Sequence, residues 1–251
     1  MIQAMPLTAI RIVLVEPSHP GNIGAVARAM KNMALAELVL VRPKAFPHAE
    51  ASARASGADD LLSRTRVVAS VTEAVADCGF VAATTSRPRD QNFRALDVHE
   101  AAVRIYEMSA RSPAAVLFGA ERTGLTNEEL ALAHLLIRIP ANPDYPSLNL
   151  AMAVQLVCYE LFRAAGSPAS GRPLSESPVP LAPGEDMERF YAHLQEVMDE
   201  VDFRDRTQSG TQLMTRIRRL FQRCEMDQNE VNILRGFLTS VQSKRRPAGR
   251  S

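Results

Sequence analysis

The sequence of 251 residues is 46% hydrophobic and 23% charged, and its net charge is +1. These totals suit a globular protein that has one full-sized core and a small second unit. They exclude a chain that binds nucleic acid through its overall charge, so any RNA site has to be local, and no run of residues reaches transmembrane length.

Strand-like and helix-like segments alternate as far as about residue 165, which predicts an α/β fold with a parallel sheet and helices on both faces. Runs of aliphatic residues predict strands at Ile10–Val15, Glu37–Val41, Arg66–Ala69, Phe80–Ala83, Ala115–Phe118 and Leu136–Ile139. Helical spacing of apolar residues predicts helices at Asn22–Leu35, Ala49–Ala55, Thr72–Asp77, Asp97–Met108, Asn127–Ala133 and Leu148–Ala164.

The first strand leads into the stretch "HPGNIGAVARAM", residues 19–30. Asn22 is a typical N-cap residue, and Arg28 falls outside the apolar face of the predicted helix. The side chain of Arg28 lies on the same side of the helix as Gly24 and Gly21. We expect these two glycines to let the backbone of a ligand approach, because bare N–H groups at a helix start favour anions.

Three further segments follow predicted strands, and ligands of open α/β sheets bind at such carboxyl ends. In "VLFGAERTGLTNEEL", Gly119 and Gly124 flank Glu121, and the spacing of Thr126 and Glu129 predicts a capping box. The segment "IRIPANPDYPSLNLAMAVQL" forms a polar loop that ends at Ser147, the expected N-cap of the next helix. A weaker signal is "VAATTSR", in which three hydroxyl side chains end a strand.

Each of these signals also has an ordinary structural interpretation: a turn glycine, a capping serine or a solvated arginine. A nucleotide-binding dehydrogenase is disfavoured, since "GNIGAVA" lacks the G-x-G-x-x-G pattern and Arg42, not an acid, follows the second strand. A catalytically silent RNA-binding protein of the same fold stays open.

The second unit follows a segment rich in Pro, Ser and Gly, which indicates a linker. Helical periodicity then predicts three amphipathic helices, of which the second should bury Leu213, Ile217, Leu220 and Phe221, and the third Val231, Leu234, Phe237, Leu238 and Val241. We therefore divide the chain into a first domain at 1–165, a linker at 166–184, a helical domain at 185–243 and a disordered basic tail at 244–251.

The cysteines and histidines indicate neither disulfides nor metal. The three cysteines are far apart and are expected to be reduced core thiols of a cytoplasmic protein: Cys78, Cys158 and Cys224. The five histidines have no ligand spacing, so no metal is expected, and the beginning of the sequence lacks a signal-peptide pattern.

In combination, the motifs resemble those of the SpoU branch of the SPOUT methyltransferases. The matching residues are Pro20, Asn22, Gly24, Ala25 and Arg28, then Phe118, Gly119, Glu121, Gly124 and Leu125, then Ile139, Pro140, Ser147, Leu148, Asn149, Leu150 and Ala151. The third motif departs from the wider branch, which has Met and Gly after I-P, and it is similar to the TrmJ group. The segments "GEDMERFYAHL" and "NILRG" extend that resemblance into the helical domain.

The resemblance implies an S-adenosylmethionine-dependent enzyme that methylates the ribose 2′-oxygen of nucleotide 32 in the tRNA anticodon loop. It further implies that the C-terminal part of the first domain forms a trefoil knot, that the protein is a homodimer and that no metal takes part. A different tRNA position or a ribosomal RNA is the alternative substrate, and the preferred base is not evident.

The resemblance also assigns roles to residues. It implies a cofactor site at Thr84, Thr85, Ser86, Gly119, Ile139, Pro146, Ser147 and Leu148. It implies catalytic roles for Arg28, Asn22, Glu121, Ser147 and Asn149. The family arginine is often described as the base, but guanidinium groups do not release protons readily, so we favour Arg28 as a clamp on a phosphate and the developing alkoxide.

Candidate RNA contacts complete the prediction. Tyr145 could stack on a base or simply fill its loop. Six arginines lie between residues 204 and 223 against one acid, Asp205. Helical spacing places Arg216, Arg219 and Arg223 on one side and Arg218 on another, so the first three form the expected phosphate-binding stripe. The helical domain could bind tRNA, serve the dimer, or do both.

Overall fold

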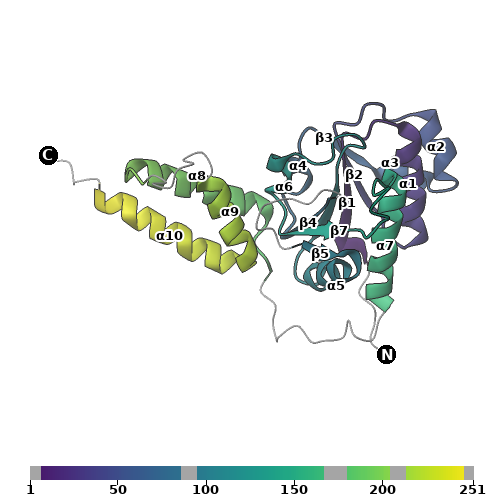
Figure 1. Ribbon diagram of the computed structural model, residues 1–251. Coiled ribbons are helices and arrows are strands. Elements are labelled where there is room, and N and C mark those ends of the chain that lie inside the picture. The colour runs from purple at the N-terminus through teal and green to yellow at the C-terminus, as the bar shows by residue number, and fades with distance from the viewer. Residues whose placement is uncertain (1–6, 86–94, 167–179, 204–212, 246–251) are drawn as a thin grey trace.

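A seven-stranded, fully parallel sheet lies at the centre of the first domain in the computed structural model (Figure 1). The structure describes residues 7–85, 95–166, 180–203 and 213–245. The strand order is β3-β2-β1-β6-β4-β7-β5. The strands are β1 (Ile10–Val15), β2 (Glu37–Val41), β3 (Arg66–Val68), β4 (Phe80–Thr84), β5 (Ala95–Asp97), β6 (Ala114–Phe118) and β7 (Leu135–Arg138). The predicted α/β class and parallel sheet are therefore confirmed.

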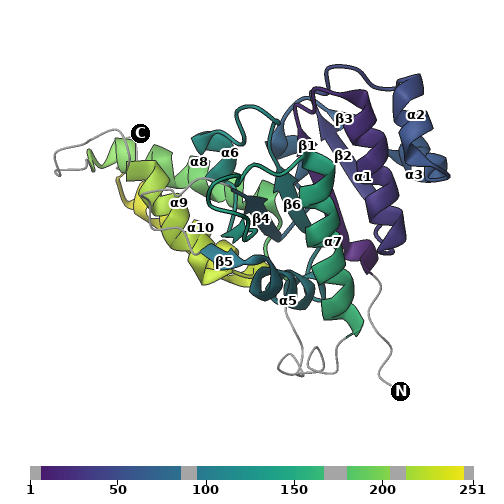
Figure 2. The same cartoon turned by 45° about the vertical axis from the view of Figure 1, so that its right-hand side comes forward.

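Helices cover both faces of this sheet, and three more form a unit beside it (Figures 1 and 2). The helices of the first domain are α1 (Pro20–Asn32), α2 (Ala49–Ala55), α3 (Asp59–Arg64), α4 (Val71–Ala74), α5 (Val98–Ser109), α6 (Asn127–Leu130) and α7 (Leu150–Gly166), preceded by the 3-10 turn Leu7–Ala9. The helical unit consists of α8 (Gly184–Glu200), α9 (Leu213–Cys224) and α10 (Gln228–Arg245).

Alternating side chains of each strand supply the two layers of the core. In β1, Ile10, Ile12 and Leu14 face the layer of α1, α2, α5 and α7, whereas Val13 and Val15 face the layer of α4 and α6. Because both faces are covered, the strand is apolar almost throughout rather than alternating with polar residues. This explains why the run of aliphatic residues was sufficient to predict it.

Two helix starts differ from the sequence prediction. Helix α1 begins at Pro20, and the Nδ1 atom of its N-cap, His19, accepts a hydrogen bond from the Gly21 N–H at 3.2 Å, so Asn22 lies inside the first turn. Helix α7 begins at Leu150, where the Asn149 side chain accepts from the Ala151 N–H at 2.9 Å. The prediction of Asn22 and Ser147 as N-caps was therefore wrong, which leaves both side chains for other contacts.

The close approach to α1 at Gly24 is made by this chain itself. A Cβ atom at Gly24 would overlap the backbone carbonyl of Ala51 in α2, and one at Gly21 would crowd the side chains of His19 and Glu50. The expectation that these glycines admit the backbone of a ligand is thus corrected, because α2 fills the space next to Gly24.

Substitution of Gly24 by alanine should destabilise the fold by about 3 kcal/mol, since the clash is with backbone and cannot be relieved by a rotamer change. As a matched control, alanine at Gly236 in α10 meets no atom within 4 Å and should stabilise the helix by up to about 1 kcal/mol. Chemical unfolding of both variants measures the difference. Equal stabilities would contradict the packing described here.

The helical unit is attached to the first domain by backbone hydrogen bonds. The N–H groups of Gly184 and Glu185 donate to the carbonyls of Cys78 and Ala76 at 2.9 and 2.8 Å. Arg104 of α5 also forms an ion pair with Glu225, which follows α9. The described end of the predicted linker is therefore packed, and Leu181 and Ala182 in it are buried. Residues 167–179 and 246–251 lie outside the described residues.

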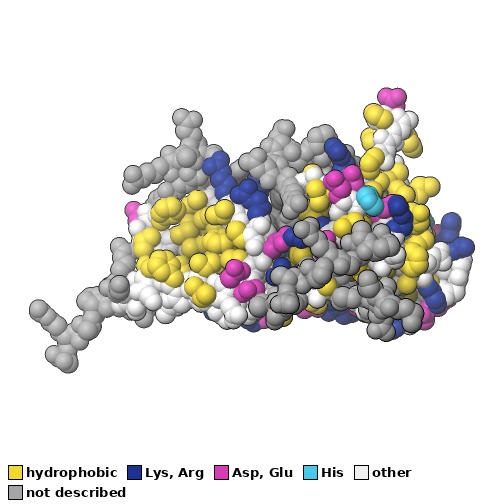
Figure 3. All heavy atoms as spheres, turned by 90° about the horizontal axis from the view of Figure 1, so that it is seen from below, with side chains coloured by type: hydrophobic (Ala, Val, Ile, Leu, Met, Phe, Trp, Pro, Cys, Tyr) yellow, Lys and Arg dark blue, Asp and Glu magenta, His cyan; other side chains and the backbone are white. Residues whose placement is uncertain are grey.

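One side of the helical unit remains apolar and exposed, which departs from the prediction. The side chains of Leu220 and Phe237 were expected in the core but are 50% and 65% exposed, and Ile233 is 70% exposed. Figure 3 shows hydrophobic side chains gathered over this unit. Periodicity identified the apolar residues correctly but not which of them three helices can cover.

The cysteines also divide into two kinds. Cys78 and Cys158 are buried free thiols, and burial raises the pKa of each to about 12. Cys224, the last residue of α9, is exposed, so its expected place in the core was wrong.

A histidine near the helical unit gives the fold a pH dependence. The ring of His134 stacks on Phe80 with centroids 5.1 Å apart, and its Nδ1 atom accepts from the Val81 N–H at 3.1 Å. Burial lowers the pKa of His134 to about 4. The unfolded chain binds a proton near pH 6.5, so this residue makes the protein less stable as the pH falls from about 6.5 to 4.

Across that pH range, we expect the wild type to lose about 3 kcal/mol more stability than the His134→Asn variant, whose amide oxygen can accept the same hydrogen bond without titrating. Unfolding in denaturant at pH 7 and pH 4.5 tests this. Parallel pH profiles for the two proteins would show that His134 does not remain neutral in the fold.

Candidate active site

A cavity of about 370 Å³ opens at the carboxyl edge of the sheet, where the segments after β6, β4 and β7 meet. These three strands are neighbours, so parallel pairing brings their carboxyl ends together. Residues assigned to the cofactor line the cavity: Thr84, Thr85, Gly119, Ile139, Pro146, Ser147 and Leu148. Ser86 lies outside the described residues.

The segment after β6 folds back on itself through two glycines. The Gly124 N–H donates to the Ala120 carbonyl at 2.8 Å, and Gly124 has a φ of +70°. A Cβ atom at Gly119 would overlap the backbone of Gly124, so this tight approach requires glycine. The predicted capping box of Thr126 and Glu129 then starts α6. The result is a wall of the cavity made largely of backbone groups.

Glu121 joins three of the predicted catalytic residues in one polar network. Its carboxylate accepts from the Asn22 side chain at 3.0 Å and from the Ser18 N–H at 3.1 Å. Asn149 donates in turn to the Asn22 side-chain oxygen at 3.3 Å. Burial raises the pKa of Glu121, but hydrogen bonds from Asn22 and Ser18 outweigh it and leave that pKa below its ordinary value. The carboxylate is therefore ionised and fixes the orientation of both amides.

Arg28 does not join this network. It is exposed, and its guanidinium donates to the Ser56 hydroxyl at 3.3 Å. Six residues separate it from Asn22, which corresponds to about 9 Å along α1 and the opposite side of the helix. Within one chain, the structure thus separates Arg28 from the cavity and from the other predicted catalytic residues. Sequence reasoning missed its partner Ser56, because no motif links positions 28 residues apart.

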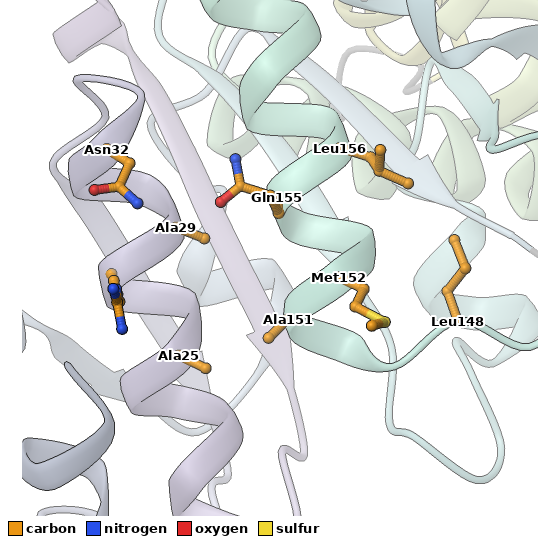
Figure 4. Close-up of a pocket in the computed structure, with 9 residues that line it drawn as sticks. Ala25, Ala29, Asn32, Leu148, Ala151, Met152, Gln155 and Leu156 are labelled. Atoms are coloured by element: carbon orange, nitrogen blue, oxygen red, sulfur yellow. The ribbon is translucent and has the colours of Figure 1, made fainter. Parts of the chain in front are cut away.

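Arg28 instead lines a groove of about 490 Å³ between α1 and α7 (Figure 4). Small and apolar side chains form most of its surface. The labelled residues are Ala25, Ala29 and Asn32 of α1, Leu148 before α7, and Ala151, Met152, Gln155 and Leu156 of α7.

The proposed RNA contacts lie in two places. Tyr145 is 79% exposed in the loop after β7, which turns at Asn142 through hydrogen bonds from the Asp144 and Tyr145 N–H groups. On α9, Arg216 and Arg223 are exposed and Arg219 is half-buried. Arg218 behaves differently, because it pairs with Glu188 and lies 4.4 Å above the ring of Tyr191. Arg204 and Arg206 lie outside the described residues.

Two structural features of the described ranges bear on partners. No helix in them combines the length and apolarity needed to cross a bilayer. Over the same residues, His, Cys, Asp and Glu side chains form no group of three that could hold a metal ion.

Comparison with known proteins decides the family. Residues 9–159, which contain the cavity and the Glu121 network, match the model of the SpoU rRNA Methylase family. The chain belongs to this family. Residues 185–250 of this SpoU-family chain match a second model, described as the C-terminal domain of tRNA methyltransferase TrmJ.

Relatives of this SpoU-family chain extend over nearly its whole length. A tRNA (cytidine/uridine-2'-O-)-methyltransferase TrmJ of Cronobacter sakazakii is 44% identical over 95% of this chain and 98% of its own. The crystal structure of TrmJ from Z. mobilis ZM4 has a TM-score of 0.80 and 36% identity, covering 92% of this chain and 98% of its own.

A more distant neighbour shares the fold. The SpoU methyltransferase AviRb from Streptomyces viridochromogenes, solved in complex with AdoMet, has a TM-score of 0.50 and 22% identity. It covers 62% of this chain and 57% of its own.

Proposed function

We propose that this protein transfers a methyl group from S-adenosylmethionine to the ribose 2′-oxygen of nucleotide 32 in the tRNA anticodon loop, in the cytoplasm. The observation that carries the proposal is similarity to TrmJ enzymes across both domains, the TrmJ-type C-terminal domain included. The cavity and the ionised Glu121 network provide the site. Similarity limited to the first domain would support only some SpoU-type methyl transfer.

The residues of the cavity fit S-adenosylmethionine. A volume of about 370 Å³ lies in the usual range for small-molecule sites. The glycine-closed turn exposes backbone groups, while Thr85 and Ser147 add hydroxyls and Ile139 and Leu148 add apolar surface. When bound, the cofactor supplies an electrophilic sulfonium methyl, so no metal is required for the chemistry.

The chain has to align the ribose hydroxyl and accommodate its proton. Correct alignment alone can lower a barrier by about 7–11 kcal/mol. Glu121, Asn22 and Asn149 hold one another in fixed orientations and would position the ribose, with Ser147 beside them in the cavity. Arg28 would clamp the adjacent phosphate and the developing alkoxide, while that phosphate or solvent takes the proton. A neutral Arg28 acting as base is the alternative.

We further propose a homodimer in which Arg28 serves the cavity of the partner. In one chain Arg28 is directed into the groove between α1 and α7, away from its own cavity. Along α7, Met152, Leu156 and Tyr159 are 61%, 40% and 45% exposed and lie at helical spacing, so they form an apolar stripe. A two-fold axis at this stripe would cover it and bring the two sites together.

The trefoil knot is also part of this proposal. Strand β7 lies outside β4 in the sheet, whereas the following helix α7 packs against both α1 and α5. The chain therefore crosses back over the carboxyl ends of the central strands after β7. This return path supports the knotted topology that the family resemblance implies.

The arginine stripe of α9 is proposed to bind tRNA phosphates. Glutamine at Arg216, Arg219 and Arg223 together should raise the tRNA Kd and lower the slope of log Kd against log salt by about two to three units, nearly one for each lost contact. Cofactor affinity and dimer mass should not change. Fluorescence anisotropy in a salt series measures the slope. The control replaces three exposed arginines of the first domain: Arg54, Arg64 and Arg66.

An unchanged tRNA Kd at every salt concentration would return the stripe to a solvated surface. Dissociation of the dimer instead would show that α9 serves assembly.

The proposed function is tested with the purified protein, labelled S-adenosylmethionine and two tRNAs that differ only in a ribose or 2′-deoxyribose at nucleotide 32. We expect methyl transfer to the first tRNA and none to the second, and calorimetry should show cofactor binding without metal. Transfer to both tRNAs would indicate another position. Transfer to ribosomal RNA alone would indicate a ribosomal substrate, and cofactor binding without transfer to any RNA would favour a silent RNA-binding protein.

A further inference from the structure

The carboxyl edge of the sheet carries cations beside the cavity that the motifs do not include. Strands β2, β1 and β6 are consecutive in the sheet, so the segments that follow them lie side by side along this edge. The Lys44 N–H donates to the Pro17 carbonyl at 3.2 Å, and the Ser18 N–H donates to Glu121. Lys44, Ser18 and the 119–124 turn therefore form one continuous row.

Pairing leaves two cations of this row available. Arg42 is engaged by Glu16 at 3.0 Å and also contacts Glu129. Lys44 and Arg122 are exposed, and among the described residues their side chains form no ion pair or hydrogen bond. The two acids within these segments, Glu16 and Glu121, are already engaged by Arg42 and by the polar network. The unpaired charge of the row is thus positive at both ends.

The third donor in the row is His19. Its Nδ1 atom accepts from the Gly21 N–H, so the neutral ring carries its proton on Nε2, and its side chain is 61% exposed. Neighbouring strands lie about 4.8 Å apart, which puts the segments of Lys44 and Arg122 about 10 Å apart on either side of Ser18 and His19. A strand of RNA that crosses the strand ends would meet one donor from each segment.

We infer that Lys44, His19 and Arg122 form a phosphate-binding rim that holds the RNA strand on the first domain next to its reacting ribose. This inference rests on the proposed function and names the residues that position its substrate. Glu121, between the cations, faces a part of the strand without charge, such as a ribose, whereas Lys44 and Arg122 bind the flanking phosphates. Phosphate contacts of this kind set register rather than sequence preference.

The test measures tRNA binding by the full-length protein over a salt series. Lys44→Gln should lower the slope of log Kd against log salt by about 0.7, and Lys44→Gln with Arg122→Gln by about 1.4, because each variant removes one or two single-strand phosphate contacts. The double variant should raise Kd on the order of tenfold at low salt. His19→Asn keeps an acceptor for the helix cap and should raise Kd without changing the fold.

Two controls separate the rim from other effects. Arg66→Gln removes the same charge at the start of β3, on the opposite edge of the sheet, and should leave Kd and slope unchanged. Arg122 also lines the cavity, so calorimetry has to show unchanged cofactor affinity in its variant. Lys44 does not line the cavity, and its variant tests the rim even where that affinity changes.

Wild-type Kd and slope in both Lys44 variants would overturn the inference, as would an equal effect of Arg66→Gln. Because the readout is binding, failure of the proposed function is recognised separately. In that case the wild type would bind tRNA through the rim but transfer no methyl group to nucleotide 32.

Discussion

Alanine at Arg28 is expected to lower the rate of methyl transfer at least about 100-fold, with little change in stability or cofactor affinity. The reason is that Arg28 is exposed, touches only Ser56 in its own chain and lies outside the cavity. Its loss therefore removes a charge that acts on the substrate and no part of the core. Single-turnover assays with tRNA, chemical unfolding and calorimetry with S-adenosylmethionine measure the three quantities.

The lysine variant separates charge from geometry. Lysine keeps the positive charge but loses the planar fork that binds two oxygens, so Arg28→Lys should also be strongly impaired. Arg54→Ala, an exposed arginine of the neighbouring helix α2, is the matched control and should retain activity. Near-normal turnover of Arg28→Ala would contradict both the clamp and the base roles, and a fully active Arg28→Lys would leave only a role for charge.

Mixing two inactive variants is expected to restore activity. If Arg28 of one chain serves the cavity of the other, Arg28→Ala and Glu121→Ala chains are each inactive alone, yet their heterodimer contains one intact site. Random exchange makes about half of the dimers mixed, each with one working site of two, so about a quarter of the wild-type activity should return. Methyl transfer before and after co-refolding of the two variants measures this recovery.

No recovery, with heterodimers present by native mass spectrometry, would show that Arg28 acts within its own chain. Recovery in the absence of any dimer would contradict the proposed assembly.

The strands and the cavity could be predicted because their signals are local. The run Ile10–Val15 is apolar on both faces, and the capping box of Thr126 and Glu129 is contained within four residues. The cavity residues follow strands that end at one edge, so motif order and parallel pairing brought them together. Strand β5 has three residues and helix α3 has six, too few for a periodic pattern, and both were missed.

Features that depend on distant residues could not be predicted. The space beside Gly24 is filled by Ala51, and nothing near Gly24 in the sequence indicates this. The N-cap of α1 is an imidazole, which is not among the preferred capping side chains, so Asn22 was chosen in its place. Helical spacing placed Arg28 off the apolar face of α1, but only the structure shows that it is separated from Glu121 and Asn149.

The most direct test of the central claim is a map of ribose methylation in tRNA from cells that lack this protein, compared with the same cells supplied with wild type or with Arg28→Ala. We predict that 2′-O-methylation at nucleotide 32 of the anticodon loop disappears, returns with the wild type and does not return with the variant. An unchanged signal at nucleotide 32, or a loss confined to other positions, would contradict the assignment.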